Sequence, residues 1–504
     1  MAQKYIEKIL TARVYDVAIE TPLEEARVLS QRLGNQILLK REDMQPVFSF
    51  KLRGAYNRIF NLTDAQKKKG VIAASAGNHA QGVALAGTRL GIRSVIVMPK
   101  TTPDIKVAAV RHFGGKAVLH GDSYDDAQAY AWTLAEKEGL TFIHPFDDPD
   151  VIAGQGTVGM EIVRQHPDPV AAIFVPVGGG GLISGVASFI KYLRPEVKII
   201  GVEPEDTPTF HEALKRNRRV TLKEVGLFAD GVAVRQMGKE NWRLARQLVD
   251  EVILISTDEM CAAIKDIFED TRTMMEPAGA LAVAAIKKYV AREQVSGETL
   301  IAINSGANIN FERLRHVTER AELGEKREAL LGVTIPEKPG SFRTFCKTIG
   351  NRGITEFNYR YSGPESAQVF AGIKLSKGDE ERQVIVTRLE AQGYQVVDMT
   401  ENEVAKVHLR YMVGGHGQEV ENEQLYRFMF PERPGALLRF LTAMGKCWNI
   451  SLFHYRNHGA AFGRILVGIQ VPPKERRAFT ESLDQLGYQY WNESENPVYR
   501  LFLS

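Results

Sequence analysis

Short apolar runs alternate with stretches of helical periodicity over residues 1 to about 310, and this rhythm restricts the fold strongly. Apolar runs of this length are typical of buried parallel strands, and a helix between two of them completes a βαβ unit. We therefore predict an α/β architecture of doubly wound parallel sheets. The expected strands are Val71 to Ala74, Ser94 to Met98, Ala117 to His120, Ile173 to Val177, Ile199 to Glu203, Val252 to Ile255 and Leu300 to Asn304.

One lysine, Lys51, lies between the apolar residues Phe50 and Leu52. Because a poorly solvated ammonium group loses its proton more readily, we expect the pKa of Lys51 to fall and its amine to become a nucleophile. An amine of this kind can form a covalent link to an aldehyde. The alternative is an ordinary surface lysine, since lysine is rarely buried.

Four consecutive glycines, Gly178, Gly179, Gly180 and Gly181, follow an apolar run and precede a helical pattern from Leu182 to Tyr192. Glycine lets backbone N–H groups converge on an anion, and the start of a helix adds its positive dipole end. The pattern predicts a phosphate-binding turn. It is not a P-loop, because no Gly-Lys-Ser/Thr follows. The alternative is a flexible turn without a ligand.

Two further turns are rich in small and hydrogen-bonding residues: Ala74 to Gly82, which leads into a helix from Ala80 to Leu90, and Asn304 to Asn308. Open α/β sheets bind ligands at the carboxyl ends of their strands, where such turns lie. Each turn is also compatible with an ordinary helix cap. Together with Lys51 and the glycine run, they indicate a cofactor that has an aldehyde, a phosphate and a polar ring, as pyridoxal phosphate has.

The motifs that carry a family resemblance are Ser49 to Ala55, Ser75 to His79, Gly178 to Leu182 and Ser305 to Asn308. They resemble the fold-type II pyridoxal-phosphate enzymes, and among these the biosynthetic threonine deaminases (threonine ammonia-lyases), over nearly the whole chain. The resemblance implies pyridoxal 5'-phosphate as cofactor. It also implies β-elimination and deamination of L-threonine to 2-oxobutanoate and ammonia, the first step of isoleucine biosynthesis, with L-serine as an alternative substrate.

The resemblance also implies a set of cofactor-binding residues. Lys51 would carry the cofactor and move the α-proton, and Asn78 would bond the ring hydroxyl. Ser305 would face the ring nitrogen, where a hydroxyl, unlike a carboxylate, does not hold the nitrogen protonated and so favours prompt elimination. The full expected set is Lys51, Asn78, Gly178, Gly179, Gly180, Gly181, Leu182 and Ser305.

The substrate carboxylate is expected to bind the turn formed by Ser75, Ala76, Gly77 and Asn78, through a hydroxyl and backbone N–H groups. Two neighbouring titratable residues, His79 and Glu276, are expected to be structural, because catalysis needs a geometry that the sequence does not supply. No metal site is expected.

The C-terminal part contains an internal repeat: Pro336 to Gly340 recurs as Pro431 to Gly435 with the pattern Pro-Glu-x-Pro-Gly. Each copy has the order strand, helix, strand, strand, helix, strand, which is typical of a ferredoxin-like α+β fold. The repeat resembles the paired ACT-like domains of feedback-regulated threonine deaminases. That resemblance implies isoleucine as inhibitor, valine as activator and a homotetramer.

Two tyrosines, Tyr359 and Tyr455, occupy matching points in the two copies. Tyrosine in a strand most often serves packing. The alternative, which the resemblance implies, is that the pair lines two related effector pockets.

At 504 residues the chain is too long for a single core. We expect a catalytic domain over 1–318, a charge-rich linker helix over 319–330, and two ACT-like regulatory domains over 331–414 and 424–504. The net charge of +3, from 64 basic and 61 acidic residues, gives no case for a nucleic-acid or membrane partner. Three scattered cysteines and an N-terminus without a signal sequence predict a cytoplasmic protein.

Two other functions remain open. One is another fold-type II enzyme, such as a serine dehydratase, a serine racemase or a threonine synthase, which the catalytic motifs hardly separate. The doubled C-terminal domain argues against a purely catabolic dehydratase. The second is a non-enzymatic amino-acid sensor on an inactive enzyme fold, against which Lys51, the glycine run and Ser305 argue.

Overall fold

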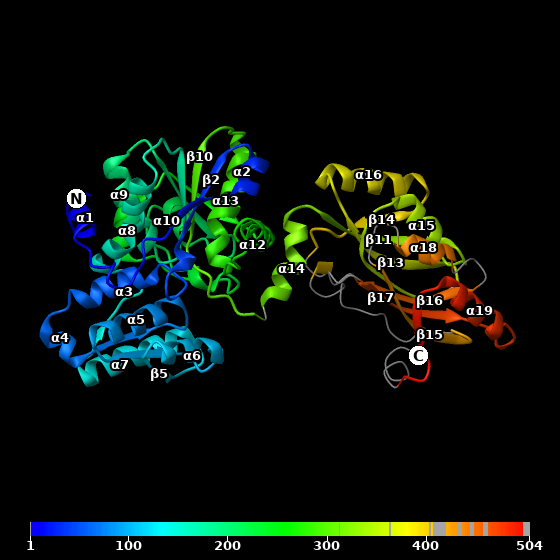
Figure 1. Ribbon diagram of the computed structural model, residues 1–504, viewed down its shortest axis with the longest axis horizontal. Coiled ribbons are helices and arrows are strands. Elements are labelled where there is room, and N and C mark those ends of the chain that lie inside the picture. The colour runs from blue at the N-terminus through cyan, green and yellow to red at the C-terminus, as the bar shows by residue number, and fades with distance from the viewer. Residues whose placement is uncertain are drawn as a thin grey trace. The chain divides into compact units, whose positions relative to one another are not determined.

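The structure, a computed structural model, describes residues 2–311, 313–361, 364–402, 405–406, 420–431, 436–443, 448–456 and 462–496. The chain divides into two compact units, Met1–Ala321 and Glu322–Ser504 (Figure 1). Among the described helices, none combines the length and the apolar character that crossing a membrane requires.

The first unit contains a six-stranded sheet in the order β1-β2-β10-β7-β8-β9, parallel except for the edge strand β1. Its strands are β1 (Leu23–Glu25), β2 (Gln36–Arg41), β7 (Ala172–Pro176), β8 (Lys198–Pro204), β9 (Glu251–Ile255) and β10 (Thr299–Asn304). Successive residues of β7 face opposite helix layers: Ile173 and Val175 pack with α8 and α9, whereas Ala172 and Phe174 pack with α12 and α13. This two-sided burial explains why the strand is a continuous apolar run.

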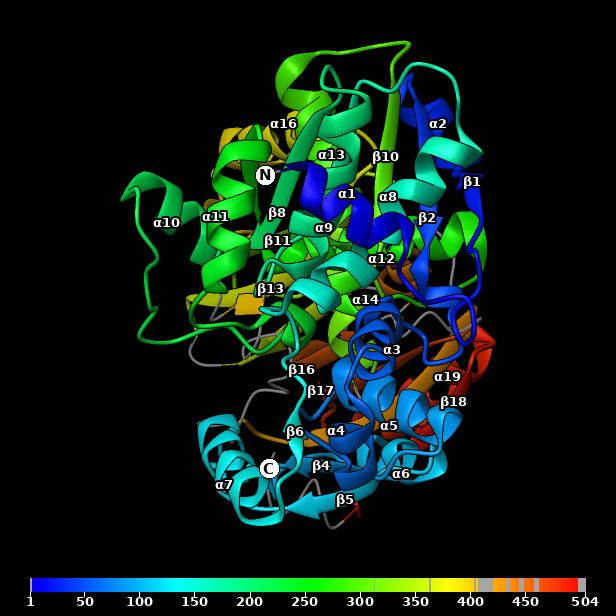
Figure 2. The ribbon, with the colours of Figure 1, turned by 90° about the vertical axis from the view of Figure 1, so that its left-hand side faces the viewer.

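A smaller parallel sheet in the same unit has the order β5-β4-β3-β6 and is surrounded by helices α5, α6 and α7 (Figure 2). Its strands are β3 (Val71–Ala74), β4 (Ser94–Met98), β5 (Lys116–Leu119) and β6 (Thr141–Phe142). The predicted strands are confirmed, with bounds within about one residue. Strands β1, β2 and β6 were not predicted.

The helices of the first unit follow the expected alternation with the strands. They are α1 (Ala2–Leu10), α2 (Arg27–Leu33), α3 (Lys51–Phe60), α4 (Asp64–Lys69), α5 (Asn78–Leu90), α6 (Asp104–His112), α7 (Tyr124–Glu138), α8 (Pro149–Gln165), α9 (Gly181–Leu193), α10 (Thr209–Lys215), α11 (Lys239–Leu248), α12 (Thr257–Thr271), α13 (Pro277–Glu293) and α14 (Arg313–Gly324), with the 3-10 turns η1 (Glu42–Met44) and η2 (Asp230–Val232).

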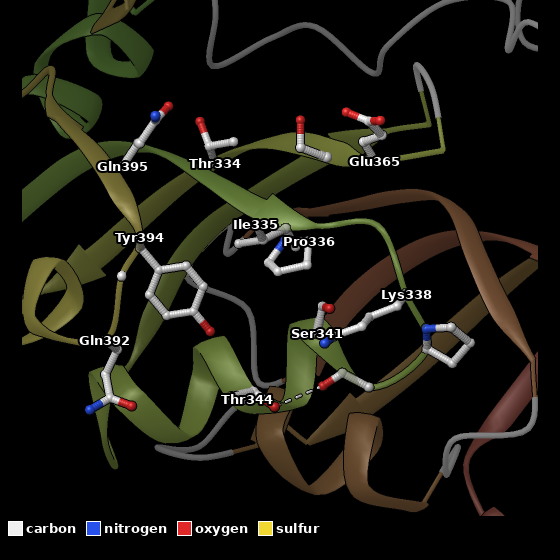
Figure 3. Close-up of a pocket in the computed structure, with 14 residues that line it drawn as sticks. Thr334, Ile335, Pro336, Lys338, Ser341, Thr344, Glu365, Gln392, Tyr394 and Gln395 are labelled. Carbon is white, nitrogen blue, oxygen red and sulfur yellow. Dashed lines mark hydrogen bonds between the residues drawn. The ribbon is translucent and has the colours of Figure 1, made fainter.

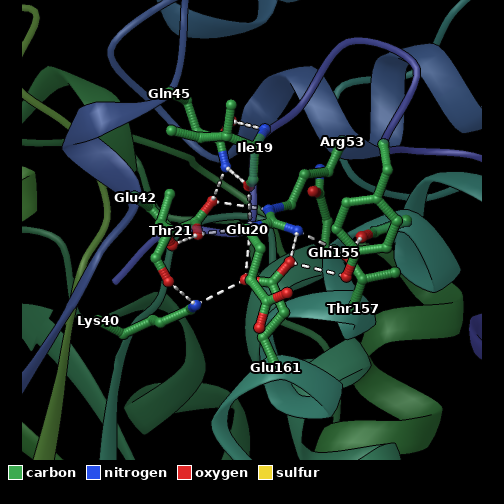
Figure 4. A network of polar contacts seen from close by, with 12 residues as sticks. Ile19, Glu20, Thr21, Lys40, Glu42, Gln45, Arg53, Gln155, Thr157 and Glu161 are labelled. Carbon is green, nitrogen blue, oxygen red and sulfur yellow. Dashed lines mark hydrogen bonds and ion pairs between the residues drawn. The ribbon is translucent and has the colours of Figure 1, made fainter. Parts of the chain in front are cut away.

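A network of fully buried ions joins α3, α8 and the end of β2 (Figure 4). The guanidinium of Arg53 donates to both carboxylate oxygens of Glu42, each at 2.7 Å, and to those of Glu161 at 2.6 and 2.9 Å. Lys40 donates to Glu161 at 2.6 Å and to the carbonyl of Thr21 at 2.6 Å. Burial alone would raise the pKa of Glu42, but the guanidinium of Arg53 holds it below its usual value. Two positive and two negative side chains therefore compensate one another out of contact with water.

The second unit contains the βαββαβ order twice, as predicted. The first copy has β11 (Glu328–Pro336), α15 (Ser341–Ile349), β12 (Ile354–Arg360), β13 (Ser366–Lys374), α16 (Gly378–Ala391) and β14 (Gln395–Asp398). The second has β15 (Glu423–Pro431), α18 (Ala436–Ala443), β16 (Asn449–Arg456), β17 (Phe462–Gln470), η4 (Pro473–Glu475), α19 (Arg476–Leu486) and β18 (Gln489–Asn492).

The two copies form one eight-stranded sheet, β14-β11-β13-β12-β16-β17-β15-β18, because β12 pairs with β16 in antiparallel register. Their apolar residues share a single core. The first Pro-Glu-x-Pro-Gly segment, Pro336 to Gly340, joins a strand to a helix as predicted. In the second copy, residues 432–435 lie outside the described residues.

The predicted linker helix over 319–330 is wrong at its end. Helix α14 stops at Gly324, and β11 already begins at Glu328. The reason is tertiary: Ala329, Leu330 and Leu331 are buried, and they pair with β13. The many charged residues of this segment favoured a solvated helix in the prediction, so the short apolar run at its end was not recognised as a strand.

The buried ion network yields a stability prediction. Replacing Glu161 with Gln keeps the shape but leaves Lys40 and Arg53 buried with excess positive charge. Breaking a buried pair in this way typically costs about 3–5 kcal/mol, so the urea midpoint of the first unit should fall clearly. The control is Glu138→Gln, which removes the exposed partner of Arg93 and should cost about 1 kcal/mol or less. Equal midpoints for the two variants would contradict the prediction.

Candidate active site

Residues from seven separate segments of the first unit line one cavity near the carboxyl ends of β7 and β10. Parallel strands place these ends at one edge of the sheet, which is where such folds bind ligands. The lining includes every residue that the sequence predicts for the cofactor. It consists of Phe50, Lys51, Asn78, Phe146, Pro176, Gly178, Gly179, Gly180, Gly181, Leu182, Gly231, Val232, Val234, Glu276, Ala278 and Ser305.

Lys51 is the first residue of α3, and its ammonium lies 5.3 Å from the centre of the Phe50 ring. The ammonium donates to the carbonyl of Pro145 at 3.3 Å. Removal from water lowers the pKa of Lys51 to about 8, although the nearby carboxylate of Glu276 acts in the opposite direction. The unprotonated fraction of the amine at neutral pH is therefore much larger than that of an ordinary lysine, as the apolar neighbours in the sequence suggested.

The glycine run is held by contacts to its carbonyl groups. The carbonyl of Gly179 accepts from the N–H of Gly238 at 3.1 Å and from the side-chain amide of Asn241 at 3.0 Å. Because a trans peptide points its N–H opposite to its C=O, the N–H of Gly180 faces the other way. Gly180 has φ +93° and begins α9 as its N-cap. The run thus presents backbone donors and a helix start to the cavity.

A chain of amides and one carboxylate fixes Asn78. The amide of Asn308 donates to the carbonyl of Val47 at 2.8 Å and to the side-chain oxygen of Asn78 at 2.7 Å. The amide nitrogen of Asn78 in turn donates to Glu276 at 2.7 Å. This order of donors leaves Asn78 a second N–H for a ligand in the cavity. Burial raises the pKa of Glu276 to about 7, with Asp230 adding to the effect.

The remaining predicted residues occupy two positions. Ser305 is buried and lines the cavity, and its hydroxyl donates to the carbonyl of Ala278 at 3.4 Å. The turn Ser75 to Gly77 connects β3 to α5, and the N–H of Gly77 donates to the Ser75 hydroxyl at 3.3 Å. In the described chain, Ser75, Ala76 and Gly77 are not part of the cavity lining, although Asn78, which follows them, is.

Sequence reasoning missed Phe146 and Asn241 and gave Glu276 only a structural role. Asn241 lies on α11, far along the chain from the glycine run, and no local pattern marks its contact with Gly179. His79, in contrast, fits its expected structural role. Its Nε2 lies 2.9 Å from the carbonyl of Ile143, and burial lowers its pKa to about 3, so the ring is neutral.

Known proteins resemble the whole chain. Residues 14–306 match the family described as "Pyridoxal-phosphate dependent enzyme", and residues 319–409 and 414–503 each match "C-terminal regulatory domain of Threonine dehydratase". The chain is 55% identical to the biosynthetic L-threonine dehydratase IlvA of Burkholderia multivorans over 99% of both proteins. It is 53% identical to the Escherichia coli protein of that name, over 99% of this chain and 97% of the relative.

This chain belongs to the biosynthetic threonine dehydratase family. A solved structure, the processed form of threonine deaminase isoform 2 from Solanum lycopersicum, is 52% identical and has a TM-score of 0.63. It covers 64% of this chain and 93% of its own. Maize serine racemase has a TM-score of 0.58 at 32% identity over 63% of this chain and 96% of its own. The catalytic fold is therefore common to several activities, whereas the regulatory match is to threonine dehydratase.

Threonine dehydratases belong to the pyridoxal-phosphate family, and the donors of this cavity fit that cofactor. An amine with a lowered pKa suits its aldehyde, a glycine cup at a helix start suits its phosphate, and the second N–H of Asn78 suits its ring oxygen. The cavity measures about 40 Å³, and the ring of Phe146 lies close to Gly179 in its wall.

The lowered pKa of Lys51 can be tested in the cofactor-free protein. Acylation by a limiting amount of acetic anhydride follows the unprotonated fraction, so labelling of Lys51 should reach half its maximum near pH 8 rather than near the ordinary lysine value of 10.5. Glu276→Gln removes the carboxylate that raises this pKa, so the midpoint should move to still lower pH. Peptide mass spectrometry provides the measurement. A midpoint near 10.5 would show that the amine is fully solvated.

The glycine cup can be tested by adding one methyl group. A Cβ on Gly180 would lie 2.4 Å from the Met237 methyl carbon and 2.9 Å from the Asn241 Cβ. We expect Gly180→Ala to lose cofactor and Gly180→Asp to lose more, because a carboxylate repels phosphate. Gly297→Ala is the matched control, since Gly297 also has positive φ but has open space around it. Cofactor content is read from absorbance, and normal retention by Gly180→Ala would mean that the run is only a turn.

Proposed function

We propose that this protein is a feedback-regulated threonine dehydratase that converts L-threonine into 2-oxobutanoate and ammonia, with L-serine as an alternative substrate. The observation that carries the proposal is the pairing of one cavity, containing Lys51, the glycine cup and Ser305, with two regulatory domains of threonine dehydratase type. We further propose that isoleucine inhibits and valine activates it, that the working assembly is a homotetramer, and that the reaction is the first step of isoleucine synthesis.

Each residue of the cavity has a role in this proposal. Bound pyridoxal phosphate supplies an electron-withdrawing ring that accepts the electron pair left when the α-proton departs. The amine of Lys51 would hold the cofactor aldehyde and, as a free amine, would accept the α-proton of the substrate. The backbone N–H groups of Gly178 to Leu182 hold the phosphate, and Asn78 donates to the ring oxygen.

Two further contacts direct the reaction towards elimination. Ser305 would offer the ring nitrogen a hydroxyl, which, unlike a carboxylate, does not hold that nitrogen protonated; this would favour elimination of the β-hydroxyl. The turn Ser75 to Asn78 holds the substrate carboxylate, which the position of Asn78 at the cavity and of Ser75 to Gly77 directly before it supports. Carboxylate binding there requires the substrate to extend beyond the cavity lining.

The alternative activities are less well supported. A serine racemase shares the catalytic fold, as the maize structure illustrates, but the two regulatory matches of this chain are of threonine dehydratase type. An inactive amino-acid sensor would not need a buried Lys51 of lowered pKa in the same cavity as an intact glycine cup. Domain limits of 1–318, 331–414 and 424–504 stay our proposal, close to the division between Ala321 and Glu322.

The contacts of the two tyrosines favour the packing role over the effector role. Tyr359 and Tyr455 are 3% and 2% exposed and belong to the core of the second unit. The hydroxyl of Tyr359 donates to Glu337 at 2.5 Å, and its ring lies 4.8 Å from that of Phe342. These contacts support a packing role. Removal of either ring should therefore cost stability, typically about 3–5 kcal/mol for a large aromatic side chain.

The proposed reaction is tested by assaying purified protein for keto acid formed from threonine and serine, with and without isoleucine. Borohydride reduction followed by peptide mapping should place a pyridoxyl group on Lys51, and Lys51→Ala should abolish turnover while the fold survives. Lys68→Ala, an exposed lysine on α4, is the control and should remain active. Label on another lysine, or racemisation of serine without keto acid from threonine, would overturn the proposal.

A further inference from the structure

Five consecutive residues, His144 to Asp148, lie between β6 and α8, and the last four of them each hold a different part of the catalytic unit. The carbonyl of Pro145 accepts from the amine of Lys51 at 3.3 Å. Phe146 lines the cavity, and its carbonyl accepts at 2.9 Å from the side-chain amide of Asn241, the same amide that holds the glycine run.

The two carboxylates of this segment each begin a helix. Asp147 accepts from the N–H groups of Lys239 at 2.8 Å and Glu240 at 2.9 Å, at the start of α11, the helix that carries Asn241. Asp148 accepts from N–H groups in the first turn of α8 at 2.8 and 3.2 Å. The segment therefore connects both halves of the cofactor site, the amine and the glycine cup, to one short stretch of backbone.

One ring nitrogen of His144 determines the course of this backbone. Its Nδ1 accepts from the N–H of Phe146 at 3.3 Å and from the N–H of Asp147 at 2.8 Å. Asp and Asn form turns in the same way, with a side-chain acceptor that binds N–H groups two and three residues ahead, and Asp148 does so at the start of α8. Histidine thus takes a part that a carboxylate or an amide usually plays.

His144 can form this turn only as a neutral ring. A nitrogen that accepts hydrogen bonds cannot carry the proton, so the proton lies on Nε2. Burial lowers the pKa of His144 below its usual value, and the charge of Lys51 acts in the same direction, although Asp147 and Asp148 oppose it. A carboxylate at position 144 would form the same turn but would bring a negative charge towards Lys51 and raise the pKa of that amine.

The walls of the catalytic cavity leave little room for displacement. The cavity measures about 40 Å³, whereas the pocket at β11, α15 and β14 of the second unit measures about 600 Å³ (Figure 3). A Cβ on Gly179 would lie 2.2 Å from the ring of Phe146, so this ring lies close to the glycine run. Because closely packed groups transmit a displacement, a change in the turn at His144 reaches the glycine cup.

We propose that His144 is a positioning residue of the cofactor site: the lone pair of its Nδ1 holds the segment from Pro145 to Asp148, which places the amine of Lys51 and the glycine cup for pyridoxal phosphate. The inference rests on the roles proposed above for Lys51 and the glycine cup. The alternative is a packing role, since the centre of the His144 ring lies 4.6 Å from that of Phe146 and 6.4 Å from that of Phe142. The two roles need different parts of the side chain.

Two substitutions separate the acceptor from the aromatic ring. His144→Asn keeps a neutral acceptor and removes the ring, whereas His144→Phe keeps a ring and removes the acceptor. The dissociation constant of pyridoxal 5'-phosphate is read from absorbance on the cofactor-free, full-length chain. We expect His144→Asn to remain within about threefold of the wild type and His144→Phe to bind at least about tenfold more weakly, equivalent to about 1.4 kcal/mol.

His112→Phe makes the same exchange at an exposed histidine on α6 and should bind the cofactor like the wild type. If His144→Phe binds pyridoxal 5'-phosphate at least as tightly as His144→Asn, the ring and not the acceptor is what matters, and the inference is overturned.

A third substitution tests why the acceptor is neutral. His144→Asp forms the turn with a carboxylate, so acylation of Lys51 by acetic anhydride should reach its midpoint above the wild-type value of about pH 8, whereas His144→Asn should leave the midpoint in place. This measurement needs neither bound cofactor nor a folded His144→Phe variant. An unchanged midpoint in His144→Asp would mean that position 144 does not act on the amine, and would overturn the inference.

A probe without an aldehyde reports on the glycine cup alone. Pyridoxine 5'-phosphate keeps the ring and the phosphate but cannot form a covalent link to Lys51. His144→Phe should weaken its binding too, because the turn also places the cup. Unchanged binding of pyridoxine 5'-phosphate by His144→Phe would overturn that part of the inference.

The outcome is separable from that of the proposed function. If reduction labels Lys51 and threonine yields keto acid, but His144→Phe binds the cofactor as tightly as His144→Asn, the inference fails and the proposed function stands. If reduction labels another lysine while His144→Asn retains the binding that His144→Phe loses, the turn at His144 stands and the proposed role of Lys51 fails.

Discussion

The catalytic unit depends on the two ion pairs that the guanidinium of Arg53 forms. It is fully buried and shared between Glu42, which follows β2, and Glu161 on α8. A residue two positions away on a helix lies about 200° around its axis, so Arg53 faces this network while Lys51 faces the cavity. The ion pairs of Arg53 fix the position of α3. They therefore also position the amine of Lys51, although Lys51 itself forms none of them.

Burial and a compensating charge also act together in the cavity. Removal from water lowers the pKa of Lys51, and the carboxylate of Glu276 limits the shift, which leaves the pKa at about 8. Glu276 also accepts a hydrogen bond from Asn78 and so orients it. One residue thus both affects the pKa of Lys51 and positions Asn78. On the opposite side, Asn241 and Gly238 fix the Gly179 carbonyl and so determine which way the glycine donors point.

In the regulatory unit, duplication solves a packing problem and creates an asymmetry. Pairing of β12 with β16 satisfies two strand edges that each copy alone would expose, and it merges the two cores. Tyr359 and Tyr455 are buried within that shared core. The two copies are nevertheless not identical: Ser341 of the first aligns with Ala436 of the second.

The sequence by itself determined the alternation of strands and helices, the glycine turn, the reactive character of Lys51 and the doubled regulatory fold, because each is written in local periodicity or in neighbouring residues. It did not reveal β2, whose end carries Lys40 and Arg41; these charges are compatible with burial only because Glu161 and Asp43 meet them there. Nor did it place the end of α14 or the contact of Asn241 with Gly179. Those depend on groups far apart in the chain, and only tertiary packing decides which charges are compensated and which polar groups meet.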